Sequence, residues 1–204
     1  MKLYHVKTGL LGVNSYFLVD EKTSKAVLID CGEFYNKITQ VAEKYGFDIK
    51  AVLLTHAHFD HSGCASKLQS NGAKIYISKK DADKITREQT LAERFGKSFD
   101  IFYPDYTFED GDVLEFGEIK IKVLITPGHT DGSAVFICEN MIFSGDTLLA
   151  GTYGRTDFPT GSDIQIKNSI NRLFDLEGEY NVYPGHDAFT TLSIERKYNP
   201  IKFL

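Results

Sequence analysis

The sequence lacks the features that mark membrane, nucleic-acid-binding and disulfide-stabilised proteins. Its three cysteines, Cys31, Cys64 and Cys138, are an odd number without CxxC spacing, so no disulfide scaffold is expected. No apolar run approaches the length of a transmembrane helix, and the first residues lack the apolar region of a signal peptide. A net charge of −5 without a basic stripe argues against a nucleic-acid partner. We therefore expect a cytoplasmic protein, with no membrane and no nucleic-acid partner, that folds as one domain over residues 1–204.

The sequence also lacks the signatures of a protein nucleophile. It contains no GxSxG motif, and nothing in it sets Cys31 or Cys64 beside a base. It contains instead histidines and aspartates that follow apolar runs. Five of the six histidines fall at predicted strand-to-loop boundaries, and Asp146 closes the run Ile-Phe-Ser-Gly-Asp. The candidate metal ligands are His56, His58, Asp60, His61, His129, Asp146 and His186.

Seven such ligands are too many for one tetrahedral ion, but they suit two ions that share a carboxylate. A solvated surface turn would explain the His56-Ala57-His58 run alone. It does not explain why His129, His186 and Asp146 also follow strands. Imidazole and carboxylate groups without thiolate suit zinc, iron or manganese, and the sequence does not choose between them.

Short apolar strands alternate with helical patterns along the chain. Strands are predicted at residues 14–20, 26–30, 51–54, 74–77, 113–116, 119–125, 134–138, 141–144 and 181–183. Helices are predicted at residues 34–45, 62–69, 81–94, 164–176 and 191–197. Residues 96–112 and 150–162 are predicted to be irregular. Buried strands that each deliver a polar side chain at one end can gather a site from distant parts of a sequence.

The motifs HxHxDH, TPGHT, SGD and YPGH, in this order and with this approximate spacing, resemble the signature of the metallo-β-lactamase superfamily. The resemblance extends from Asp30 nearly to the end of the chain. It implies an α+β fold, the αββα sandwich, in which two mixed sheets lie face to face with helices outside and the site at one edge. It also implies that His56, His58 and His129 bind one metal, that Asp60, His61 and His186 bind a second, and that Asp146 bridges them. Asp30 would then be a buried carboxylate that supports the ligands.

The resemblance further implies hydrolysis, with a metal-bound hydroxide as nucleophile. Two divalent ions are expected, zinc in the first place and iron or manganese as alternatives. Asp60 is expected to have the added catalytic role of orienting the nucleophile. The run GRTDFPxG at residues 154–161, with the closing Asn199-Pro200, resembles the short glyoxalase II-like hydrolases, which cleave thioesters of a thiol carrier. Arg155 would bind a carboxylate of that carrier or form a salt bridge with Asp157 or Asp187. Tyr153 would either contact the substrate or pack within the protein.

Other branches of the superfamily remain as alternatives. The persulfide dioxygenases also resemble this chain, with one iron on the equivalents of His56, His129 and Asp146, and they oxidise a thiol persulfide with O₂. A lactone hydrolase is a further alternative. Asp146 argues against a true β-lactamase, many of which lack an aspartate there. The retention of all seven ligands argues against a degenerate, non-enzymatic domain. We therefore expect a monomeric or homodimeric hydrolase whose substrate is a small acyl thioester such as S-lactoylglutathione.

Overall fold

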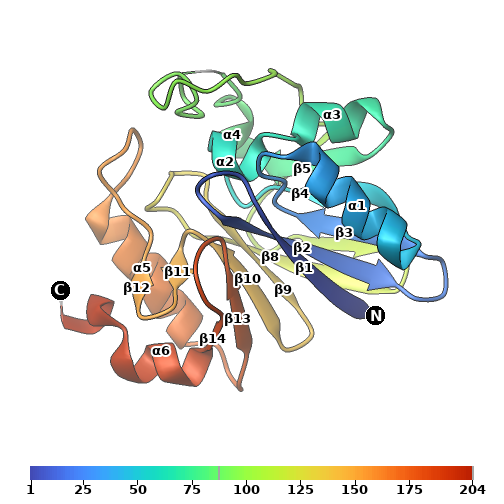
Figure 1. Ribbon diagram of the computed structural model, residues 1–204. Coiled ribbons are helices and arrows are strands. Elements are labelled where there is room, and N and C mark those ends of the chain that lie inside the picture. Colours follow the sequence, from blue (N-terminus) through green and yellow to red (C-terminus); the bar gives the residue numbers. More distant parts are fainter. Residues whose placement is uncertain (87, 204) are drawn as a thin grey trace.

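A computed structural model describes residues 1–86 and 88–203 of the chain. Two six-stranded mixed sheets lie face to face, and helices cover their outer sides (Figure 1). The predicted α+β sandwich is therefore confirmed. Within the described residues, no helix has both the length and the apolar character needed to cross a bilayer.

The first sheet has the strand order β1-β2-β3-β4-β5-β6. Its antiparallel part is β1 to β3 and its parallel part is β3 to β6. The strands are β1 (Lys2–Thr8), β2 (Val13–Asp20), β3 (Lys25–Ile29), β4 (Asp48–Leu53), β5 (Lys74–Ser78) and β6 (Tyr106–Phe108).

The second sheet has the order β14-β13-β10-β9-β8-β7 and is antiparallel except between β10 and β13. A separate two-stranded hairpin, β11 with β12, follows β10. The strands are β7 (Val113–Phe116), β8 (Ile119–Ile125), β9 (Ala134–Cys138), β10 (Met141–Gly145), β11 (Leu148–Leu149), β12 (Thr152–Tyr153), β13 (Asn181–Pro184) and β14 (Thr190–Thr191).

The helices lie in two outer layers. Figure 1 shows α1 and α3 on the side of the first sheet and α5 and α6 on the side of the second. The helices are α1 (Tyr35–Tyr45), α2 (Phe59–Ser62), α3 (Ala65–Ser70), α4 (Lys79–Ala82), α5 (Asp163–Phe174), α6 (Leu192–Tyr198) and the 3₁₀ helix η1 (Pro200–Phe203). As predicted, Gly46 ends α1, in a left-handed conformation with φ 71°, and its N–H donates to the Ala42 carbonyl.

The side-chain alternation of the strands explains the layers. In β2, Phe17 faces the core beneath α1, whereas Tyr16 and Leu18 face the core between the sheets. In β8, Ile121 is fully buried between the sheets while the neighbouring Lys120 is exposed. A third apolar cluster joins the second sheet to α5 and α6. Sheets with both faces buried read as nearly continuous apolar runs, which is why these strands could be predicted.

The predicted helix at residues 81–94 is wrong. The structure has only the short α4, followed by turns, and Leu91 adopts a left-handed conformation with φ 66° that an α-helix does not allow. One residue of the predicted range, Arg87, lies outside the described residues. The polar groups of this segment bind other loops instead of a helix ladder: the Thr90 carbonyl, for example, accepts a hydrogen bond from the N–H of Phe59. The predicted helix at residues 62–69 is divided at Gly63 into α2 and α3.

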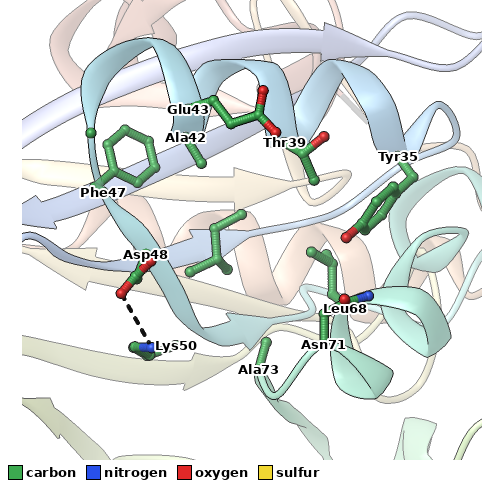
Figure 2. A pocket seen from close by; sticks show the side chains of 12 residues that line it. Tyr35, Thr39, Ala42, Glu43, Phe47, Asp48, Lys50, Leu68, Asn71 and Ala73 are labelled. Carbon is green, nitrogen blue, oxygen red and sulfur yellow. Dashed lines mark ion pairs between the residues drawn. The ribbon is translucent and has the colours of Figure 1, made fainter.

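A surface hollow of about 400 Å³ lies between α1, β4 and α3 (Figure 2). Tyr35, Phe47 and Leu68 line it, and Asp48 and Lys50 form a 3.4 Å ion pair at its margin. None of the predicted ligand residues lines this hollow. The candidate site therefore lies elsewhere in the fold.

Candidate metal centre

The structure brings all seven predicted ligand residues together from four loops. The loop after β4 and the short helix α2 carry His56, His58, Asp60 and His61. The loops after β8, β10 and β13 supply His129, Asp146 and His186, respectively. These loops leave the carboxyl ends of β4 in the first sheet and of β8, β10 and β13 in the second, so residues separated by up to 130 positions meet.

The seven side chains form two clusters of three with one carboxylate between them. The ligand atoms of His56, His58 and His129 lie within 4.8 Å of one another, and so do those of Asp60, His61 and His186. The Oδ2 atom of Asp146 lies 3.6 Å from Nε2 of His129 and 3.6 Å from Nε2 of His186, one from each cluster. A further group of ligand atoms within the same 4.8 Å joins His56, His61 and Asp146, so the two clusters adjoin each other.

Hydrogen bonds to the outer ring nitrogens fix which nitrogen of each histidine faces the centre. His129 Nδ1 lies 2.8 Å from the Arg155 carbonyl, and His186 Nδ1 lies 3.2 Å from the Leu11 carbonyl. A carbonyl only accepts, so each Nδ1 carries the proton and each Nε2 presents a lone pair to the centre.

Asp30 orients two of the histidines from beneath. Its Oδ2 atom lies 2.7 Å from His61 Nδ1 and also accepts the hydroxyl proton of Thr55 at 2.8 Å. Because the Thr55 hydroxyl donates to Asp30, its oxygen is free to accept from His56 Nδ1 at 3.1 Å. The buried Asp30 therefore directs the Nε2 atoms of both His56 and His61 toward the centre, as the sequence predicts for a supporting carboxylate.

Burial and charge prepare these groups to bind cations. Burial lowers the pKa of His58 to about 3 and that of His56 well below its ordinary value, so both rings are neutral at pH 7. Burial alone would raise the pKa of Asp146, but the facing His61 and His186 hold it well below its ordinary value. The centre thus combines the neutral imidazoles of His56 and His58 with an ionised carboxylate, the forms in which these side chains bind metal. His61 and His186 differ: burial alone would lower their pKa values, but Asp146 and the other nearby carboxylates raise them, so metal binding there would displace a proton.

Two buried polar atoms at the centre have no hydrogen-bond partner among the described residues, His56 Nε2 and Asp146 Oδ1. Asp131 Oδ1, outside the centre, also has no hydrogen bond among the described residues. It lies 2.5 Å from Lys84 Nζ, however, so its charge is paired. Leaving a buried polar atom unpaired is costly, so orphaned atoms at a cluster of ligands point to a missing partner. A lone pair and a carboxylate oxygen that face one point fit a divalent cation.

One supporting residue, Asp81, is not part of any motif and could not be identified from the sequence. It is fully buried. Its Oδ2 accepts a 2.9 Å hydrogen bond from the N–H of Ala57 and a 3.0 Å bond from the hydroxyl of Thr130. Lys84 Nζ lies 2.9 Å from its other oxygen. Asp81 therefore ties the loop of His56 and His58 to the loop of His129.

The centre opens into a cleft of about 380 Å³ with mainly apolar walls. The predicted ligands that line it are His58, Asp60, His129, Asp146 and His186. The walls are formed by Leu11, Leu91, Phe95, Leu149 and Phe158. A small ligand with an apolar part can thus contact these walls while it reaches the centre.

The two predicted substrate contacts lie in different surroundings. Arg155 lines the cleft, but its guanidinium forms two 2.6 Å hydrogen bonds to Asp157, one from Nε and one from Nη2. The internal salt bridge is thus the arrangement observed, with Asp157 and not with Asp187. Tyr153 packs against the apolar cluster beneath α5 and α6 and is not among the residues that line the cleft.

Comparison with known proteins agrees with this geometry. The family model described as the metallo-beta-lactamase superfamily matches residues 8–186. The hydroxyacylglutathione hydrolase GloC of Haemophilus influenzae is 36% identical over 189 residues, which are 89% of this chain and 88% of GloC.

Two solved structures are similar over nearly their whole length. The structure of the BLEG-1 B3 metallo-beta-lactamase matches with a TM-score of 0.91 and 27% identity, covering 98% of each chain. The structure of TTHA1623 in a di-iron-bound form matches with a TM-score of 0.88 and 33% identity, covering 98% of this chain and 100% of that one.

Proposed function

The chain belongs to the metallo-β-lactamase superfamily, and we propose that within it the protein is a dinuclear metal-dependent hydrolase of a small acyl thioester. The observation that carries the proposal is the pair of three-residue clusters joined by Asp146. The 36% identity to a hydroxyacylglutathione hydrolase supports the choice of reaction.

We assign His56, His58 and His129 to the first ion, and the second cluster of Asp60, His61 and His186 to the other. Asp146, between the two clusters, would serve both ions. When bound, two divalent ions supply an acidified water at neutral pH and polarise the carbonyl that it attacks. Zinc is the ion we expect, and the di-iron form of TTHA1623 supports iron as the alternative.

We assign the orientation of the attacking water to Asp60. Burial alone would raise the pKa of Asp60, but His61 and His186 lower it, so the carboxylate is ionised at neutral pH. Its Oδ2 lies 3.4 Å from His186 Nε2, and the residue lines the cleft where a substrate enters. An ionised carboxylate in this place can accept a hydrogen bond from water and hold its lone pair toward the acyl carbon.

The apolar cleft walls suit a thioester better than a highly charged substrate at the point of reaction. Hydrolysis adds water to the acyl carbon and breaks its bond to sulfur, which releases a carboxylic acid and a thiol. We propose S-lactoylglutathione or an analogue with another thiol as substrate. The three free cysteines are buried, which fits a reducing compartment, and we place the enzyme in the cytoplasm.

Thiol release and O₂ uptake, measured side by side, test this proposal. Protein loaded with zinc, and separately with iron, would be given S-lactoylglutathione, other acyl thioesters, a glutathione persulfide and a β-lactam. We expect thiol release from a thioester, and its loss in the metal-loaded Asp146→Ala variant. O₂ uptake with the persulfide and no thioester cleavage would establish the dioxygenase alternative. Efficient cleavage of the β-lactam alone would show that the family resemblance to BLEG-1 extends to its named activity.

A further inference from the structure

We propose that Arg94, and not Arg155, binds a free carboxylate of the thiol carrier at the mouth of the cleft. This inference rests on the proposed function, because it specifies a feature of that substrate. It adds a residue that no sequence motif marks and that lies in the segment between β5 and β6.

The ring of Phe158 lies between Arg94 and the histidines of the metal centre. The ring of Phe158 lies edge-on to His58, with 5.8 Å between the two ring centroids. The guanidinium carbon of Arg94 lies over the same Phe158 ring at 5.0 Å. Phe95, the next residue, lines the cleft and lies edge-on to Phe158. A substrate that reaches His58 along the cleft therefore passes Phe158 within reach of Arg94.

The charges around Phe158 are unbalanced. The guanidinium of Arg155 lies 4.0 Å from the Phe158 ring, but its hydrogen-bonding edge is occupied by Asp157. Arg94 is exposed, and no carboxylate of residues 1–86 or 88–203 forms an ion pair with its guanidinium. Its positive charge contributes, after that of Arg155, to lowering the pKa of Asp157 to about 2, so it lies near the pair. The guanidinium groups of Arg94 and Arg155 thus both lie near the Asp157 carboxylate, which is hydrogen-bonded to Arg155.

A carboxylate of the substrate would give Arg94 the anionic partner that Asp157 gives Arg155. The planar guanidinium can donate two parallel hydrogen bonds to a carboxylate. Stacking on Phe158 limits the freedom of the Arg94 side chain before the ligand arrives, which lowers the entropic cost of binding. The other carboxylate at the mouth, Asp187, follows His186 in the loop after β13 and lines the cleft. Asp187 would therefore repel an anionic carrier, whereas Arg94, next to the lining residue Phe158, would attract it.

A specificity ratio tests the role of Arg94. The kcat/KM for S-lactoylglutathione would be divided by that for the same thioester with its carboxylates methylated. We expect the ratio to fall about tenfold in Arg94→Ala, the loss of one charge-assisted pair at a partly exposed site, and less in Arg94→Lys. Arg172→Ala is the matched control, since Arg172 is an exposed arginine paired with Asp110 on another face, and its ratio should equal that of the wild type. An unchanged ratio in Arg94→Ala, or a fall only in Arg155→Ala, would overturn the proposal.

Calorimetry separates this inference from the proposed reaction. S-methylglutathione carries the same carboxylates but no thioester, so its binding to the metal-loaded protein needs no turnover. We expect its Kd to rise about tenfold in Arg94→Ala, and added salt to weaken wild-type binding more than binding to the variant. Equal Kd values would reject Arg94 even if thioesters are cleaved. If wild-type protein cleaves no thioester, the proposed function fails, and the calorimetric comparison still decides whether Arg94 binds carboxylates.

Discussion

The carboxylate of Asp81 accepts a 2.9 Å hydrogen bond from the backbone N–H of Ala57, the residue between His56 and His58. Through the same oxygen it holds Thr130, which follows His129. A single buried side chain thus sets the separation of the two loops that carry the first histidine cluster. Positioning of this kind decides how well a metal site is preorganised.

We predict that Asp81→Ala weakens metal binding at the first cluster and destabilises the fold. The substitution leaves the buried N–H of Ala57 without its acceptor, which costs about 1–3 kcal/mol, while Lys84 keeps Asp131 as a partner. Urea unfolding and competition with a chromophoric chelator would measure the two effects. Glu115→Ala, which removes an exposed partner of Lys120, is the control and should change neither quantity. Wild-type metal affinity in Asp81→Ala would show that the loops hold their separation without this carboxylate.

Asp30→Asn should lower the affinity for the second ion roughly 10- to 100-fold, the usual effect of removing a carboxylate that orients a ligating histidine. In the wild type, the Oδ2 atom of Asp30 lies 2.7 Å from His61 Nδ1 and, as a hydrogen-bond acceptor, keeps the proton there. An amide at this position can instead present its N–H₂ group and turn the ring. Stepwise metal titration followed by cobalt absorption would measure the change, and unaltered binding of both ions would contradict the role assigned to Asp30.

Gly154→Ala is predicted to abolish most activity, although residue 154 contributes no functional group. A Cβ atom at this position would lie 1.8 Å from the carbonyl oxygen of Asp146 and 3.1 Å from His129 Nδ1. The loop and the backbone of Asp146, which carries the carboxylate between the two clusters, must therefore move apart. The control is Gly151→Asn, because a Cβ there meets nothing within 4 Å and asparagine tolerates its φ of 69°. Similar kcat/KM values for both variants would refute the steric argument.

The cysteine thiols should not react in the folded protein. Burial raises the pKa of the Cys64 thiol to about 12 and that of Cys138 to about 11, and raises that of Cys31 well above its ordinary value. The unfolded chain would release these protons near pH 9, whereas the folded chain holds them, so stability should fall as the pH rises above about 9. Alkylation at pH 8, followed by mass spectrometry, should modify no cysteine in native protein and all three in urea. Rapid alkylation of Cys31 or Cys64 in native protein would contradict this prediction and would support a cysteine nucleophile.

The sequence predicted those parts of the fold and site that depend on local pattern. The apolar run at residues 16–19 in β2 and the alternating residues of β8 indicate buried strands, and the HxHxDH run brings four candidate ligands together in six residues. The helix predicted at residues 81–94 failed because Asp81 and Thr90 bond to loops that are distant in sequence, and no periodicity records such partners. The strands β1, β6, β11, β12 and β14 were not predicted, since they are edge strands or are only two or three residues long.

Residues that act through tertiary contacts were the hardest to recognise. Arg155 stands in a motif and drew the prediction of a carboxylate partner, which the structure supplies within the chain as Asp157. Arg94 stands in no motif and is not among the residues that line the cleft, and its position over the lining residue Phe158 relates it to the site. The sequence left the role of Arg155 open between two choices, and the distances of the folded chain were needed to decide its partner.

The number of metal ions needed for thioester hydrolysis tests the central claim most directly. Metal-free protein would be titrated with zinc, and thiol release from S-lactoylglutathione would be measured at each ratio of bound metal to chain. Two clusters joined by Asp146 predict that the rate reaches its maximum only when two ions are bound per chain. A maximal rate with one ion bound, or no thiol release at two, would contradict a dinuclear thioester hydrolase.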